Sequence, residues 1–251
     1  MKFGLNVWKV LNNNWLKDSI TKGDKFVKII IINGSPRKNG SIFKILNHFR
    51  ELLEKNNVGI NIEFINLVEL NMKFCIGCQN CYKTGKCIIL DDRVEEIHDI
   101  IKSSNGIIFG SPTYASNVSG LFKNFHDRVH MTMEHLLHNK PCINVATFEN
   151  AMGKKALSIM NEMVMHAGGY CVNSMAIKNA FNKDPLDNKN LLKIEKASKK
   201  LIKNIQKNKP PLFSRIFSKI AINVVLKPFV YKNKEHNNGI INSWKEKGLV
   251  K

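Results

Sequence analysis

Short apolar segments alternate with amphipathic segments along most of the chain, and this alternation constrains the fold more than any other feature of the sequence. The first apolar segment, FVKIIIIN, is typical of a fully buried strand because it is short and rich in β-branched residues. Strands that alternate with helices form parallel sheets, so the sequence predicts a doubly wound α/β domain with helices on both faces. The expected strands are 26–33, 59–67, 105–110, 142–147 and 169–177, and the expected helices are 41–56, 91–104, 119–138 and 154–167.

The 251 residues divide into one main domain and two extensions. A chain of this length suits a single large α/β domain with additions at its ends. Residues 25–208 hold the alternating segments, and Pro210 and Pro211 mark a break after them. We expect residues 1–24 to form an amphipathic N-terminal extension and residues 209–251 to form a basic amphipathic C-terminal extension.

Positive charge is concentrated toward the C-terminus. Lys and Arg total 39 against 20 Asp and Glu, a net charge of +19, and residues 193–251 contain fifteen of the bases and only three acids. Basic charge alone gives only non-specific affinity for nucleic acid, and the chain carries no recognition motif. We therefore expect no specific nucleic-acid partner.

The stretch PLFSRIFSKIAINVVLKPF predicts a basic amphipathic helix in the C-terminal extension. Its apolar residues recur at helical spacing with two bases between them: Phe213, Ile216, Phe217, Ile220 and Val224, with Arg215 and Lys219. Such a helix can pack on its own domain, pack on a partner subunit, or lie on an anionic membrane. We expect it to pack against protein and keep the membrane surface as the alternative.

The sequence shows no targeting or membrane-spanning signal. Its first residues lack an uninterrupted apolar core, and no apolar run reaches the roughly 18 residues that span a bilayer. We therefore expect a cytoplasmic protein whose thiols stay reduced. Clustered cysteines in that compartment indicate metal or redox chemistry more than a disulfide. The segment CIGCQNCYKTGKC holds four of the six cysteines, Cys75, Cys78, Cys81 and Cys87.

A loop with the sequence GSPRKNGS joins the first strand to the first helix. Ligands of open α/β sheets bind beyond the carboxyl ends of the strands, and the start of the next helix offers free amides to an anion. Gly34 and Gly40 allow a sharp turn, and Arg37 adds positive charge. The side chains that can donate hydrogen bonds are Ser35, Asn39 and Ser41. The loop therefore indicates a phosphate site, with a simple strand-to-helix turn as the alternative.

A second loop, SPTYASNVSG, follows the third strand and runs into LFKNFHDR. With GSPRKNG, it resembles the flavodoxin-like family of NAD(P)H-dependent FMN reductases, and the resemblance extends over roughly residues 26–180. It implies a flavodoxin-like, doubly wound sheet of five parallel strands in the order 2-1-3-4-5 that binds FMN. The residues implied at the phosphate are Ser35, Arg37, Asn39, Gly40 and Ser41, and those implied at the flavin ring are Pro112, Thr113, Tyr114, Asn117 and Val118.

Two features depart from the family pattern. The family often has a hydroxyl side chain where this chain has Ile42, so we expect phosphate binding to depend on Ser41. The loop after the fourth strand is usually rich in glycine, but here it reads TFENAMG, residues 147–153. Because Glu149 would be unusual beside a reduced, anionic flavin ring, we do not count this loop among the expected flavin contacts.

The four clustered cysteines have the spacing C-x2-C-x2-C-x5-C. Cysteines two residues apart can wrap one face of a cubane cluster, and Gly77 and Gly85 permit the tight backbone that this requires. The spacing resembles the iron–sulfur flavoprotein branch of the family, which implies one [4Fe-4S] cluster bound by Cys75, Cys78, Cys81 and Cys87. A zinc site of four thiolates and a loop of thiols without metal remain alternatives.

The resemblance implies an oxidoreductase that transfers electrons between two cofactors. FMN can take up electrons as a pair and release them singly, and a cubane cluster passes one at a time. We expect no catalytic side chain, a redox partner such as a ferredoxin or NAD(P)H, and a homo-oligomer, either a dimer or a tetramer, in which the cluster loop approaches the FMN of a neighbouring subunit. The alternatives are an NAD(P)H-dependent FMN, quinone or nitro-compound reductase without a cluster, and a flavodoxin-like module docked through its basic tail.

Several other residues suit structural roles better than chemistry. His126 and His130 have a spacing that can bind zinc on a helix, but the chain has no HExxH motif. Asp127 and Arg128 are expected to form a structural ion pair or to border a subunit contact. We expect five methionines to lie on helices and pack in the core, and two cysteines to be core thiols. These residues are Met131, Met133, Met160, Met163, Met165, Cys142 and Cys171.

Overall fold

The computed structural model describes residues 27–55, 59–181 and 183–251. Five parallel strands form one sheet in the order β2-β1-β3-β4-β5, which confirms the flavodoxin-like order expected from the sequence. The expected N-terminal extension, residues 1–24, lies outside the described residues. The strands are β1 (Val27–Asn33), β2 (Ile60–Asn66), β3 (Gly106–Pro112), β4 (Pro141–Phe148) and β5 (Tyr170–Lys178).

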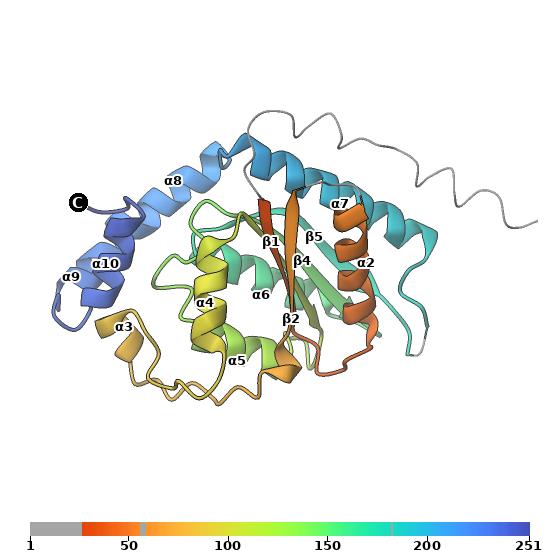
Figure 1. The fold of residues 1–251 in the computed structure, drawn as a ribbon, viewed down its shortest axis with the longest axis horizontal. Coiled ribbons are helices and arrows are strands. Elements are labelled where there is room, and N and C mark those ends of the chain that lie inside the picture. Colours follow the sequence, from red (N-terminus) through yellow and green to blue (C-terminus); the bar gives the residue numbers. More distant parts are fainter. Residues whose placement is uncertain (1–26, 56–58, 182) are drawn as a thin grey trace, which may run out of the picture.

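Helices cover both faces of this sheet (Figure 1). They are α2 (Ser41–Lys55), the short 3-10 helix η2 (Leu67–Glu69), α4 (Val94–Ser103), α5 (Gly120–Arg128), α6 (Gly153–His166) and α7 (Asn188–Lys207). Alternate residues of β1 enter two cores: Ile30 and Ile32 pack with α4, α5 and α6, whereas Ile29 and Ile31 pack with α2 and α7. All four side chains are buried, which accounts for the apolar run from Ile29 to Ile32, as in parallel sheets covered on both sides.

One helix is shorter than the sequence predicts. We expected a helix over residues 119–138, but α5 ends at Arg128 and residues 129–139 form a series of turns. Residues with positive φ in this segment are His130 (40°), His135 (51°) and Asn139 (62°). A continuous right-handed helix excludes such angles, so His126 and His130 do not share a helix face.

Contacts with distant parts of the fold explain why the helical periodicity fails in residues 129–139. The turns place His130 Nδ1 2.8 Å from a carboxylate oxygen of Glu134, and both side chains are buried. Met131 is buried in the main core and Met133 packs against the C-terminal helices, so both pack as expected but outside a helix. Tertiary packing here outweighs the local preference for a helix.

The chain continues past α7 as a second group of helices with a small core of its own. Its members are α8 (Leu212–Ile220), the π-helix η3 (Ala221–Leu226), α9 (Lys227–Tyr231) and α10 (Asn238–Glu246). Trp244 is fully buried there, and its Nε1 donates a hydrogen bond to the Met133 carbonyl at 2.8 Å. Figure 1 places α8, α9 and α10 at one end of the molecule, near the short helix α3 (Asn80–Thr84). None of the described helices is long and apolar enough to cross a bilayer.

The apolar side of α8–α9 does not pack on the chain's own domain. Phe213, Ile220 and Phe229 are 76%, 52% and 64% exposed in the described structure, which contradicts packing of this face on its own domain and does not test packing on a partner subunit. The segment contacts the rest of the chain through a different stripe, in which Ser218 and Ile222 are buried. The reason is geometric: the helix carries apolar residues on more of its circumference than one line of contact can cover.

Candidate functional site

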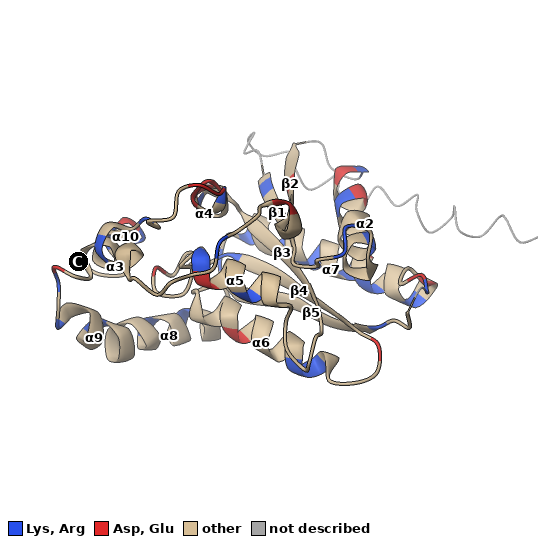
Figure 2. Cartoon of the chain, turned by 90° about the horizontal axis from the view of Figure 1, so that it is seen from below, with Lys and Arg blue, Asp and Glu red and all other residues tan. Residues whose placement is uncertain are grey.

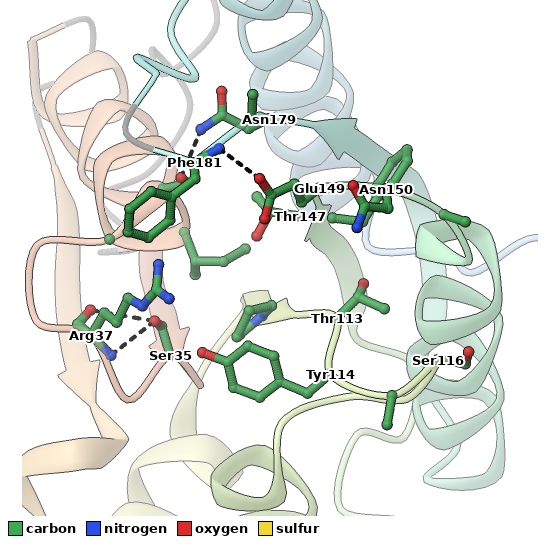
Figure 3. A pocket seen from close by; sticks show the side chains of 18 residues that line it. Ser35, Arg37, Thr113, Tyr114, Ser116, Thr147, Glu149, Asn150, Asn179 and Phe181 are labelled. Atoms are coloured by element: carbon green, nitrogen blue, oxygen red, sulfur yellow. Dashed lines mark hydrogen bonds between the residues drawn. The ribbon is translucent and has the colours of Figure 1, made fainter.

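A pocket of about 330 Å³ opens at the carboxyl ends of β1, β3, β4 and β5. The strand order reverses between β1 and β3, and open α/β sheets bind ligands at such a point. Figure 3 shows side chains from several loops converging on the pocket. Lining residues that matter below are Ser35, Arg37, Gly40, Ser41, Pro112, Thr113, Tyr114, Glu149, Asn179 and Phe181.

The loops after β1 and β3 are joined to each other at the base of the pocket. The Gly34 N–H donates to the Gly110 carbonyl at 2.8 Å, and the Ser119 hydroxyl donates to the Gly34 carbonyl at 2.5 Å. A β-carbon on Gly34 would lie 2.7 Å from a ring carbon of Phe122, so the close approach of this loop to α5 requires glycine. These contacts fix the two loops relative to one another.

Ser35 and Arg37 form a preset turn at the edge of the pocket. The Ser35 N–H donates to Asn33 Oδ1 at 3.1 Å, and the Arg37 N–H donates to Ser35 Oγ at 3.1 Å. The Arg37 guanidinium lies 5.4 Å from the centre of the Phe181 ring. The turn leads into α2, whose first amides have no partner within the helix and whose first turn carries no acidic residue. The charge of Arg37 and the helix start together favour an anion here.

Tyr114 extends from the second loop toward Ser35 (Figure 3). The backbones of Tyr114 and Asn117 exchange hydrogen bonds of 2.9 and 3.0 Å, and the residues between them have φ angles of 47° and 67°. This tight turn leaves the Tyr114 side chain partly exposed in the pocket. Beside it, Thr113 Oγ1 is buried without a hydrogen-bond partner among the described residues. A buried hydroxyl in that condition is a place where a ligand would complete a hydrogen bond.

The sequence did not lead us to the third wall of the pocket. Residues 147–151, which we had left out of the expected flavin contacts, line it, and so do residues 179–181. The Phe181 N–H donates to the Glu149 carboxylate at 3.2 Å, and Asn179 Nδ2 donates to the Ser41 hydroxyl at 2.9 Å. Their position in the chain could have indicated a role in the pocket, because both segments follow the carboxyl ends of strands.

Seven of the ten residues predicted to bind cofactor line this pocket, and three lie elsewhere. Asn39 lines an adjoining depression with Lys44 and Lys183, and this depression shares Arg37, Gly40 and Ser41 with the pocket. Asn117 Oδ1 accepts a hydrogen bond from the Val118 N–H at 2.8 Å, which stabilises the turn after Tyr114. Val118 is buried in the main core.

The cysteine loop leaves two thiols exposed and two half-buried. Cys75 and Cys78 are exposed, whereas Cys81 and Cys87 are partly buried. Cys81 lies on α3. Residues in the left-handed region bend the backbone around them: Gly77, Gln79 and Gly85. Burial, followed by the nearby charges of Cys87 and Glu134, raises the pKa of the Cys81 thiol to about 12. A bound cation would reverse this effect and favour the thiolate.

Arg128 fastens both ends of the cysteine loop to α5. Its guanidinium donates to the Lys73 carbonyl at 2.7 Å before the first cysteine and to the Ile89 carbonyl at 3.3 Å after the last. It also forms an ion pair with Asp92 at 2.7 Å, and both side chains are buried. The ion pair expected between Asp127 and Arg128 is therefore replaced by a pair between Arg128 and Asp92. Asp127 pairs separately with Lys123, at 2.6 Å.

A buried network of histidine and glutamate lies next to the cysteine loop. The Cys87 N–H donates to Glu95 Oε1 at 2.8 Å, and the same oxygen lies 3.2 Å from His130 Nε2. Glu134 bridges two imidazoles, at 2.8 Å from His130 Nδ1 and 2.9 Å from His98 Nε2. Within the described chain, His98, His130 and Glu134 form a group whose ligand atoms lie within 4.8 Å of one another, and the cysteines form no such group.

Helix α10 packs directly on the cysteine loop. A β-carbon on Gly239 would lie 2.2 Å from the Gly85 nitrogen, closer than any real contact. Nearby, His236 Nε2 lies 2.8 Å from Gln79 Oε1. The C-terminal helices are therefore part of the structure that holds the cysteines.

Comparison with known proteins places this arrangement in a family. Residues 27–182 match the family described as NADPH-dependent FMN reductase. An iron-sulfur flavoprotein of Clostridioides difficile (strain 630) is 51% identical over 223 residues, which cover 88% of this chain and 99% of that protein. An iron-sulfur flavoprotein of Methanocaldococcus jannaschii is 40% identical over 41% of this chain and 51% of its own length.

Solved structures support the fold alone, because their sequences are distant. An NADH:FMN oxidoreductase in its apo form has a TM-score of 0.55 at 16% identity, covering 75% of this chain and 94% of that one. An FMN-dependent NADH-azoreductase from Bacillus anthracis has a TM-score of 0.56 at 16% identity, covering 69% of this chain and 99% of that one. The α/β domain is thus shared with redox flavoproteins of quite different sequence.

Proposed function

The chain belongs to the NADPH-dependent FMN reductase family and, within it, to the iron–sulfur flavoproteins, and on this premise we propose that it is an oxidoreductase that binds FMN in the pocket and a [4Fe-4S] cluster on the four clustered cysteines. The observation that carries the proposal is the pairing of a pocket at the β1–β3 reversal with a four-cysteine loop held on the same domain by Arg128. When bound, FMN would supply two-electron chemistry and the cluster one-electron chemistry.

The pocket residues fit the parts of FMN. The turn at Ser35 and Arg37, with Gly40, Ser41 and the amides of α2, would hold the phosphate. Gly40 belongs to this cradle because a β-carbon there would crowd Arg37 Cβ at 3.0 Å. Asn39 lines the adjoining depression, which shares Arg37, Gly40 and Ser41 with this cradle, so it stays among the residues proposed at the phosphate.

The ring of FMN would lie between the second loop and the third wall. Tyr114 offers an aromatic surface, and the unpaired hydroxyl of Thr113 offers a hydrogen bond to a polar edge of the ring. On the other side, the Glu149 carboxylate is engaged by the Phe181 N–H. That hydrogen bond joins the loop after β4 to the loop after β5 on this side of the pocket.

The spacing of the cysteines fits a cluster better than a single zinc ion. Three cysteines that are each separated by two residues can wrap one face of a cubane, whereas zinc sites usually use two C-x2-C pairs separated by a longer loop. The charge of the irons would offset the burial of Cys81 and keep it as a thiolate.

We further propose that the cysteine loop meets another protein surface, either a second copy of this chain or a redox partner. Large apolar side chains on both sides of the cysteines are exposed: Phe74, Ile76, Ile88 and Leu90. Contiguous exposed apolar residues of this size mark contact sites. An oligomer in which the loop approaches the FMN of a neighbouring subunit would use this surface, with NAD(P)H or a ferredoxin-like protein as electron donor or acceptor.

Substitution of one exposed cysteine tests the proposal. Cys78→Ser should abolish iron and sulfide binding while FMN stays bound at about one per chain. The control is Cys171→Ser, because Cys171 lies on β5 outside the loop, and this variant should keep both cofactors. Loss of FMN in Cys78→Ser, with the fold intact by circular dichroism, would contradict the assignment of the two cofactors to separate sites.

A further inference from the structure

The segment α8–α9 presents an apolar surface to the outside of the molecule. We call it the outer face; its members are Leu212, Phe213, Ile216, Ile220, Val224, Val225 and Phe229, all exposed. Leu212, Ile216, Ile220 and Val224 recur at every fourth residue, so they form one continuous stripe along the helix. An apolar stripe this long is unusual on a protein surface and indicates a binding face.

The outer face cannot be buried by a simple rotation of the segment. Ser218, Ile222 and Val230 form the opposite stripe, and all three are buried against the rest of the chain. Ile222 and Val230 belong to the core that also contains Trp244, so the orientation of the helix is fixed from that side. The apolar stripe therefore points outward as a consequence of the fold.

The surroundings of the outer face are strongly basic. Residues 196–234 contain eleven Lys or Arg and no Asp or Glu. Arg215, Lys219 and Lys227 follow one another at helical spacing along α8–α9 and border the apolar stripe. Figure 2 shows α8 and α9 at one end of the molecule, beyond the sheet, with Lys and Arg in blue.

We propose that the outer face docks this protein on an anionic membrane surface, with the helix lying in the plane of the interface. An apolar stripe beside bases is the pattern by which interfacial helices insert shallowly and are held by anionic lipids. A second copy is disfavoured as the occupant, because pairing two outer faces would bring together two basic borders with no acid within residues 196–234 to offset them. The inference does not depend on the cofactor assignments.

Vesicle sedimentation of the full-length holoprotein tests this proposal. The wild type should sediment with vesicles that contain phosphatidylglycerol, should sediment much less with pure phosphatidylcholine, and should be released by salt. The double variant Phe213→Ser, Ile220→Ser should bind the anionic vesicles roughly tenfold more weakly or worse, because two exposed apolar anchors are lost. The matched control is Leu192→Ser, an exposed leucine on the basic helix α7, which should bind like the wild type.

Each contrary result has a definite meaning. Absence of wild-type binding to the anionic vesicles would overturn the proposal, and so would equal binding by the double variant. If the double variant instead becomes a smaller species in analytical ultracentrifugation while the wild type ignores vesicles, a second copy covers the outer face and the membrane assignment is wrong. Because both substituted side chains are exposed, unfolding of the variant is not expected, and its cofactor spectrum would verify that.

Discussion

At the scale of single residues, Arg128 shows how the fold serves the candidate site. It is 1% exposed, and its hydrogen bonds reach chain segments on either side of the four cysteines. Burying a guanidinium is unfavourable unless its donors are engaged. Asp92 and two backbone carbonyls engage both terminal nitrogens, whereas Nε has no partner among the described residues. The sequence predicted an ion pair between Arg128 and the neighbouring Asp127, but the partner is Asp92, which is 36 residues away in the chain and could not be predicted from the sequence.

Thr113 carries a prediction about FMN binding. Thr113→Val removes a hydroxyl of the pocket wall that is buried without a partner among the described residues, so FMN should bind about fivefold to tenfold more weakly to the apoprotein. Fluorescence titration with FMN measures the change. Thr132→Val, which lies outside the pocket, serves as the control and should leave the affinity as it is. An unchanged affinity in Thr113→Val would remove this residue from the flavin site.

The network of His130 and Glu134 predicts how stability depends on pH. Burial alone would lower the pKa of His130, but hydrogen bonds with Glu134 and Glu95 outweigh it and raise the pKa to about 9. Likewise, burial would raise the pKa of Glu134, but its hydrogen bonds with His130 and His98 lower the pKa to about 2. The contribution of His130 to the free energy of unfolding is thus complete below the unfolded-state pKa of about 6.5 and is lost as the pH rises through 9. The contribution of Glu134 is complete above the unfolded-state pKa of about 4.5 and is lost as the pH falls toward 2.

Anaerobic urea unfolding between pH 6 and about pH 9.5 measures how stability depends on pH. This range includes the pKa of His130 in the unfolded state and its pKa in the folded state. The free energy of unfolding of the wild type should fall by roughly 2–3 kcal/mol over that range. His130→Gln should be less stable at pH 6 and should lack most of this fall. Exposed His166→Gln is the control and should follow the wild type. A wild-type profile that stays flat to pH 9.5 would mean that His130 is not held in its charged form.

At the scale of elements, the sequence predicted where the strands lie, but it did not predict where every helix ends. The central strands β1, β3 and β4 are largely apolar on both faces, so composition identifies them, and the strand order follows from the resemblance of the loops between the strands. The helix expected over 119–138 failed because buried contacts of His130 and Glu134 favour turns. The third wall at Glu149 and Phe181 was missed because neither residue type specifies flavin binding without its place in the fold.

The contact between α10 and α3 predicts an effect of the C-terminal helices on the cysteines. Gly239→Ala would place a β-carbon 2.2 Å from the Gly85 nitrogen, so α10 must separate from the cysteine loop. We expect a variant that keeps FMN but loses much of its iron, with midpoint unfolding at lower urea concentration. Iron and flavin assays on the same sample measure this.

The control for Gly239→Ala is Gly120→Ala. A β-carbon on Gly120 would meet no atom within 4 Å, so this variant should retain both cofactors and the stability of the wild type. Full iron content in Gly239→Ala would show that α10 does not support the cysteine loop. Sequence alone could not have led to this pair, because two glycines 154 residues apart carry no signal of contact.

At the scale of the whole molecule, the chain combines a redox α/β domain with helices that serve two separate purposes. One side of the C-terminal helices closes over the cysteine loop, and the other leaves the outer face of α8–α9 exposed beside basic residues. The sequence indicated both the apolar periodicity and the charge of this tail. It could not indicate which stripe would face the protein, since that depends on how α10 and Trp244 pack beneath it.

The central claim is that one chain holds both FMN and a [4Fe-4S] cluster, and cofactor analysis of protein purified without air tests it most directly. Iron, acid-labile sulfide and flavin would be assayed on one sample, together with its absorption spectrum. The account predicts about four iron, about four sulfide and about one FMN per chain. Flavin without iron would contradict the claim and indicate a simple FMN reductase, and zinc in place of iron would make the cysteine loop a structural site.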